Sequence, residues 1–306
     1  MTIMKIGLML LYENWSNDCK KAFDNQHEMI LLGEQLGLEE VWITEHHFNK
    51  FSLSSSIIAL MGYIAAITKT MRVGTASILT PIYDPIIVAE AVATLSILSN
   101  GRFNFGVARG GPFEKQCAMF DFENSREKML QSLDQITTYL KKESGVFPET
   151  LGNIPTFIAS KHEESIKFAA QRNIGLMAAH LWSNEIIQDM IDQYKKAHTQ
   201  NLPPQMMCSR GFYMAETDDE AIKEALPSLK RFREQMEAQG ISSPIFYDEN
   251  YWIDNGVIGD KDTCLNKIKE LKALGITNLA LKPIANNIDK NKKSLELFAK
   301  EVMVNL

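Results

Sequence analysis

Three ionisable residues in a row, Glu45-His46-His47, directly follow the apolar run 41–44. Such groups at the end of a buried strand are tolerated only where they are solvated or paired. Because side chains alternate along a strand, we expect His46 on one face and Glu45 and His47 on the other. A histidine here could transfer protons or donate to a reacting oxygen. A zinc site and a plain loop-start histidine pair are the alternatives, although the segment lacks HExxH spacing and no second cluster supplies further ligands.

Two other segments could bind an anion. Arg109 directly follows the expected strand 102–108 and precedes Gly110-Gly111. This places a fixed cation beside backbone that carries no side chains, which suits a phosphate or a carboxylate. The same arginine could instead pair with a carboxylate of a neighbouring strand. The segment 160–165 (SKHEES) joins an apolar run to a helix, whose first N–H groups attract anions. Its composition is equally typical of ordinary helix capping.

Two glycine-containing segments have competing interpretations. Gly74-Thr75-Ala76-Ser77 ends an apolar run with small side chains, which either admit a flat ligand or pack tightly in the core. The segment 256–263 (GVIGDKDT) is a second candidate for a phosphate site, because TIM barrels often bind phosphate in the loops after strands seven and eight. Its two aspartates, Asp260 and Asp262, would repel an anion, so we expect it to cap the helix 265–274.

Short apolar runs alternate with amphipathic stretches along the chain, which predicts a parallel α/β sheet. Expected strands are 6–11, 41–44, 72–79, 102–108, 155–160, 174–179, 206–215 and 276–281. Expected helices are 19–36, 54–68, 86–98, 126–141, 163–171, 184–197, 218–239, 265–274 and 291–303. Eight strands in 306 residues favour a single (β/α)8 TIM barrel domain over 1–306. An open doubly wound sheet is the alternative, but no GxGxxG follows the first strand.

The interruption at 240–258 is expected to be an insertion before the last helix–strand pair. Active sites of TIM barrels are built at the C-terminal ends of the strands. That rule brings together the segments 45–47, 76–77, 108–111, 160–162, 179–180 and the residues after Leu281.

The composition, 45% hydrophobic and 23% charged, is that of a globular protein. A net charge of −6 without long basic runs argues against nucleic-acid binding. The four cysteines match neither a zinc template nor a disulfide scaffold, which favours reduced thiols in the cytosol. No stretch approaches the roughly 18–20 apolar residues of a membrane span, and the first apolar run suggests a strand rather than a signal peptide. A cytoplasmic location without membrane partners is expected.

Several segments together resemble the bacterial luciferase-like flavin monooxygenase family. They are VWITEHHF (41–48), the long stretch 73–111, Asn124-Ser125-Arg126, AAQR (169–172), VIGDKDTC (257–264) and GITNLAL (275–281). The similarity is densest over about 1–130 and covers the chain more thinly afterwards. Several motifs in order and at matching spacing make the resemblance specific.

The resemblance implies a (β/α)8 barrel that binds reduced FMN and reacts it with oxygen. By position, His46 matches the catalytic histidine, and Glu45 lies beside it in the same pocket. Ala76 and Ser77 match a pair joined by a cis peptide beneath the flavin ring. The family's phosphate site corresponds to Arg109, Ser160, Lys161, His162 and Ser165.

The chain departs from the family pattern in three places. Ala108 replaces a reactive cysteine, and Lys161 and His162 replace an acidic and a hydroxyl residue. The chain is also shorter before its last helix, where relatives carry a mobile lid.

The resulting hypothesis is an FMN-dependent monooxygenase that acts with O2 on a small apolar substrate such as an aldehyde. A separate reductase would supply the reduced FMN, and the protein is expected to form a homodimer or to be a subunit of a heterodimer. One alternative is a deazaflavin (F420)-dependent oxidoreductase, which transfers hydride. The other is a non-catalytic flavin-binding paralogue or subunit.

Overall fold

The computed structural model describes residues 4–111 and 113–306. Within this part of the chain, eight parallel strands close into a barrel, because β8 pairs with β7 on one side and with β10 on the other. The predicted TIM barrel is therefore confirmed. Its strands are β1 (Lys5–Leu10), β2 (Glu40–Ile43), β3 (Arg72–Thr75), β5 (Phe103–Ala108), β6 (Thr156–Ala159), β7 (Gly175–Ala178), β8 (Met206–Met214) and β10 (Asn278–Pro283).

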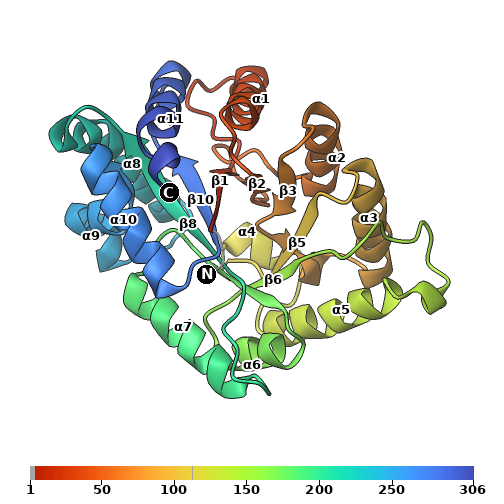
Figure 1. Ribbon diagram of the computed structural model, residues 1–306. Coiled ribbons are helices and arrows are strands. Elements are labelled where there is room, and N and C mark those ends of the chain that lie inside the picture. The colour runs from red at the N-terminus through yellow and green to blue at the C-terminus, as the bar shows by residue number, and fades with distance from the viewer. Residues whose placement is uncertain (1–3, 112) are drawn as a thin grey trace.

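Helices surround the strands as an outer ring (Figure 1). They are α1 (Cys19–Gln35), α2 (Ile57–Ile67), α3 (Pro85–Leu98), α5 (Ser125–Tyr139), α6 (Glu163–Gln171), α7 (Asn184–Ala197), α8 (Asp218–Glu237), α10 (Lys261–Leu274) and α11 (Ile288–Glu301). Their ends follow local chemistry: the Asp84 carboxylate caps α3, which begins at Pro85, and Gly275 ends α10 with a φ of 106°. A short helix, α4 (Glu114–Cys117), follows β5.

The strand expected over 72–79 is divided in two. Its first part is β3, and its second is β4 (Ile78–Leu79), which also pairs with β5. Between them lies a cis peptide bond joining Ala76 and Ser77. This is the bond that the family resemblance implied, and it lies at the C-terminal end of β3.

The barrel interior is filled by apolar side chains from six strands, namely Met9, Trp42, Phe157, Met177, Met207 and Ala280. Gly74 gives the indole of Trp42 its space, since a Cβ there would lie 2.5 Å from the ring. At the N-terminal end, the buried Glu40 carboxylate accepts hydrogen bonds from the amides of Asn104 and Asn278. This end of the barrel is thus closed, and a ligand must enter from the other.

The insertion lies before α10 and β10, as predicted. It contains a single turn at Pro244–Tyr247, then α9 (Glu249–Asp254) and β9 (Val257–Gly259). The strand β9 was not predicted; it pairs with β8 outside the barrel. The prediction that 256–263 caps a helix is confirmed, because the Asp260 side chain accepts from the N–H of Thr263. The helix begins at Lys261 rather than at 265.

All four cysteines are free thiols, so no disulfide joins these elements. Across the described ranges, no helix combines the length and apolar character needed to cross a membrane.

Candidate functional site

A cavity of about 730 Å³ opens at the C-terminal end of the barrel. This volume lies within the range of small-molecule and cofactor sites. The predicted site residues that line it are Glu45, His46, Ala76, Ser77, Arg109, Ser160, Lys161 and His162. Ser165 is not among the lining residues; it is fully buried in the first turn of α6. The topology therefore brings together residues that are up to 117 positions apart in the chain (His162 minus Glu45).

The Glu45-His46-His47 segment follows the end of β2, and its side chains differ in their contacts. Glu45 and His46 both line the cavity, and the Glu45 carboxylate accepts from the backbone N–H of Leu79 at 2.6 Å. The same carboxylate accepts from the hydroxyl of Tyr83 and contacts Nε2 of His47 at 3.2 Å. These contacts hold Glu45 in place and leave His46 as the member of the segment that is free to react.

Burial and nearby positive charge keep the His46 imidazole neutral. Burial lowers its pKa to about 4, and the charges of His47 and Lys282 contribute in the same direction. At neutral pH this ring can therefore accept a proton, or donate its single N–H, without already carrying a charge.

The floor of the cavity is largely apolar. It is formed by the cis-linked Ala76 and Ser77, together with Met177 and Met207. The Ser77 hydroxyl lies 3.6 Å from the sulfur of Met177. A planar ring system would find both a small-residue surface and soft sulfur contacts here.

One end of the cavity carries the neighbouring Arg109 and Arg126, and a third cation, Lys161, also lines the cavity. The guanidinium of Arg109 lies 4.6 Å from the centre of the Phe122 ring. Burial lowers the pKa of Arg109, and the charge of Arg126 lowers it further. Among the described side chains, the ion pairs involve none of these three cations. Cations gathered without a carboxylate form a site for an anion.

Polar atoms around this end are left unsatisfied. The Nε of Arg126, Nε2 of Gln116 and Oγ of Ser165 are buried and have no partner in the described part of the chain. The N-cap of α6, His162, makes no side-chain capping bond, so the first N–H groups of this nine-residue helix are not capped by a side chain. Buried polar groups normally find partners. A bound phosphate would supply acceptors for them, and the residues present therefore fit a flavin mononucleotide.

Arg126 and Glu13 line the cavity but were not selected as site residues from the sequence. Arg126 belongs to a segment that was quoted for the family resemblance but given no role. His180, which follows β7, and Lys282, which lies near the end of β10, fall in segments that the strand-end rule selected, but neither was given a role. Glu13 follows the first strand and contacts Lys282, with 2.8 Å between Oε1 and Nζ. Only the closed barrel shows that Glu13 and Lys282, far apart in sequence, are neighbours.

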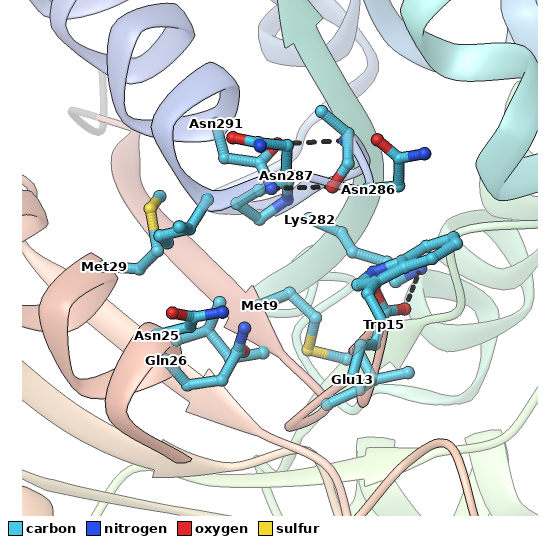
Figure 2. Close-up of a pocket in the computed structure, with 15 residues that line it drawn as sticks. Met9, Glu13, Trp15, Asn25, Gln26, Met29, Lys282, Asn286, Asn287 and Asn291 are labelled. Carbon is cyan, nitrogen blue, oxygen red and sulfur yellow. Dashed lines mark hydrogen bonds and ion pairs between the residues drawn. The ribbon is translucent and has the colours of Figure 1, made fainter. Parts of the chain in front are cut away.

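The Glu13–Lys282 pair also borders a second, narrower cleft between α1 and the start of α11. Figure 2 shows this cleft with the amides of Asn25, Gln26 and Asn286 around it, and Trp15 donating to Glu13. Met9, Leu11, Glu13 and Lys282 line both spaces, so they form a shared wall.

Helix α8 forms another side of the cavity, and the insertion packs against this helix. The α8 residues that line the cavity recur on one face, namely Ser228, Phe232, Gln235 and Met236. The ring centres of Phe232 and Trp252 lie 4.8 Å apart, and the ring centre of His180 lies 5.9 Å from each of them.

The chain matches a known family over most of its length. Residues 4–278 match the family model described as luciferase-like monooxygenase. Over 325 aligned positions it is 24% identical to the oxygenase component of flavin-dependent trigonelline monooxygenase from Acinetobacter baylyi, covering 93% of this chain and 90% of the relative. It is also 24% identical to an alkanal monooxygenase alpha chain from Photorhabdus luminescens, with 89% of each covered.

Solved structures share the fold. The oxygenating constituent of 3,6-diketocamphane monooxygenase from Pseudomonas putida, in complex with FMN, superposes with a TM-score of 0.80 at 19% identity, covering 100% of this chain and 99% of that one. An F420-dependent secondary alcohol dehydrogenase reaches 0.74 at 14% identity, with 98% of each chain covered. At these identities the likeness shows the fold alone.

Proposed function

Because the chain belongs to the luciferase-like monooxygenase family, we propose that it is the oxygenase component of a two-component, FMN-dependent monooxygenase. It takes reduced FMN and O2 and oxidises a small apolar substrate such as an aldehyde. The observation that carries this proposal is the layout of one cavity, with an unpaired cationic end at Arg109 and a neutral, half-buried His46.

The cationic end would hold the FMN phosphate. Arg109 offers a planar guanidinium for paired hydrogen bonds to phosphate oxygens, and Lys161 adds a second charge. Ser160 and His162 lie beside the first N–H groups of α6, and the buried Ser165 hydroxyl lies in its first turn. The flavin ring would then extend over Ala76 and Ser77.

When bound, reduced FMN supplies the electrons that activate O2. His46 would accept or return the proton that this chemistry moves, because its low pKa leaves the ring unprotonated at neutral pH. Glu45 has no free carboxylate oxygen to offer, so its role would be to fix the loop that carries His46.

Two partners belong to this proposal. A relative named as an oxygenase component supports a separate reductase that delivers the reduced flavin. A homodimer would cover apolar side chains that are exposed on neighbouring helices, namely Leu31 on α1, Tyr63 on α2, and Ile87 and Ile97 on α3. The whole chain would then act as one barrel domain in each subunit.

The test begins with anaerobic titration of the purified protein with reduced and oxidised FMN. We expect tighter binding of the reduced form, followed by oxygen consumption and aldehyde oxidation when air is admitted. Replacing His46→Ala should leave FMN affinity within about twofold and lower substrate oxidation by about 100-fold or more. Unchanged oxidation by the variant would exclude the catalytic role of His46.

The same experiment separates the alternatives. A deazaflavin-dependent reductase, whose fold is shared by a solved relative, would consume no oxygen with FMN and would instead transfer hydride from reduced F420. A non-catalytic flavin-binding protein would bind FMN and give oxygen consumption that does not respond to added aldehyde.

A further inference from the structure

His180 is a cavity-lining residue that the proposed flavin chemistry does not use. It follows β7 by two residues and lines the large cavity. Its Nε2 atom is buried and has no hydrogen-bond partner among the described residues. Because buried polar atoms normally find partners, an unpaired one on a residue that lines a cavity marks a place where a ligand group can bind.

The ring of His180 is held rigidly. Its centre lies 5.9 Å from those of Phe232 and Trp252, in edge-on arrangements of 88° and 60°. Trp252 is in turn fixed by donating from Nε1 to the carbonyl of Ile245 at 2.9 Å. The neighbouring residue Leu181 accepts from the hydroxyl of Tyr251 at 2.6 Å. The imidazole is therefore a preorganised polar group, which selects a ligand more sharply than a mobile one.

The charge state of His180 restricts the kind of ligand. Burial lowers its pKa to about 3, and Lys282, Arg210 and His46 contribute in the same direction. At neutral pH the ring has one N–H donor and no net charge. A neutral donor suits an uncharged oxygen, such as a carbonyl, better than a carboxylate, which would seek the cationic end of the cavity.

The surroundings of His180 restrict the rest of the ligand. Phe232 and Met236, from one face of α8, line the cavity beside it and offer an apolar surface. Trp182 lines the cavity two residues further along the same loop. A molecule bound here would place an apolar body on these side chains and a single polar atom at His180.

We propose that His180 is a specificity-determining residue, which donates a hydrogen bond to the carbonyl oxygen of an aldehyde or ketone whose apolar body packs on Phe232 and Met236. The inference rests on the proposed monooxygenase function and names the subsite that selects its substrate. If this is correct, the protein should bind a carbonyl compound more tightly than a molecule of the same shape that lacks the carbonyl oxygen.

Calorimetric titration with benzaldehyde and styrene tests this directly. The two probes have nearly the same shape, and styrene carries a vinyl group in place of the aldehyde. The protein is used with oxidised FMN bound, so that no turnover occurs. In His180→Phe we expect the ratio of benzaldehyde to styrene affinity to fall about tenfold relative to the wild type. His180→Gln should keep most of the ratio, since its amide also donates.

A matched control is His27→Phe, because His27 lies on α1 beside Tyr12 and Tyr63 and is not among the residues that line the cavity. This variant should keep the wild-type ratio. FMN affinity, measured for each variant, reports whether the barrel is intact. The proposal is overturned if His180→Phe retains the ratio, or if the wild-type protein binds neither probe. Failure of the monooxygenase proposal would appear separately, as absent oxygen consumption with reduced FMN.

Discussion

The Nζ atom of Lys282 lies 2.8 Å from Oε1 of Glu13, and this ion pair forms part of the wall between the large cavity and the cleft beside α1. Both side chains are nearly buried, at 7% and 10% exposure. Removing one partner of such a pair is strongly destabilising, because the charge that remains is buried and is not solvated by water. Burial is the main cause that lowers the pKa of His46 and of His180, and the Lys282 cation contributes to both in the same direction.

Replacing Lys282→Met should therefore raise the pKa of His46 and of His180. The side-chain volume is nearly kept, while the positive charge that opposes protonation is lost. Titration of the histidine ring signals by NMR measures both values. The double variant Glu13→Gln/Lys282→Met controls for the unpaired carboxylate, and it should show the same direction of change. Unaltered histidine titrations would contradict the electrostatic coupling.

Arg109→Ala should weaken FMN binding by about 10- to 100-fold, because one charge-assisted contact to phosphate is lost. Riboflavin, which has no phosphate, should bind the variant and the wild type alike. Flavin fluorescence quenching measures both ligands. Arg172→Ala serves as the matched control, since Arg172 pairs with Asp134 on the surface at 2.9 Å. An equal loss for riboflavin would place Arg109 elsewhere than at the phosphate.

Stability should fall as the pH is lowered from about 6.5 towards 4. The folded-state pKa values of His46 and His180 are about 4 and about 3, below the ordinary 6.5, so in this window the unfolded chain binds protons that the native protein does not. Each histidine then contributes a slope of at most about 1.4 kcal/mol per pH unit, and its stabilisation is complete above pH 6.5.

Urea unfolding at a series of pH values measures this slope. His180→Phe should flatten it by up to the contribution of one histidine. His162→Phe, at an exposed position on the cavity rim, should leave it unchanged. Parallel curves for the wild type and His180→Phe would show that His180 takes up a proton as readily in the folded protein as in the unfolded chain.

Ile97→Glu should weaken the proposed homodimer. Ile97 is 46% exposed on α3, and a carboxylate at that position would have to be desolvated within an interface. Sedimentation velocity should show the dimer dissociation constant rising at least about tenfold. Leu202→Glu is the control, because Leu202 is similarly exposed, at 49%, but follows α7. A monomeric wild-type protein would contradict the proposal outright.

The fold was predictable because its signal is spread over many residues. Apolar runs separated by amphipathic helices recur eight times, and errors of a few residues at each end do not alter the count. The strand β9 was missed because three residues between glycine and aspartate carry no alternation to recognise. Its pairing with the end of β8 joins residues about 45 positions apart, and no local pattern encodes it.

The candidate site was predictable where residues cluster in sequence and not where they cluster in space. Glu45 and His46 stand out as a polar segment after a strand, and Arg109 stands out before two glycines. Arg126 comes from α5, and its proximity to Arg109 depends on how that helix packs. Likewise, the sequence does not show that His180 packs against the aromatic rings of Phe232 and Trp252, which are 52 and 72 residues away in the chain.

Tyr251 and Trp252 reach the site from outside the barrel, through an insertion that supplies none of the eight barrel strands. Substitutions in that segment can tilt or release the His180 ring while the strands, the cis-linked floor and the cationic end keep their geometry. Selection for a new substrate could therefore act on a few insertion residues without a loss of flavin affinity. Variant libraries in which only residues 244–254 are mutated should therefore yield altered substrate specificity.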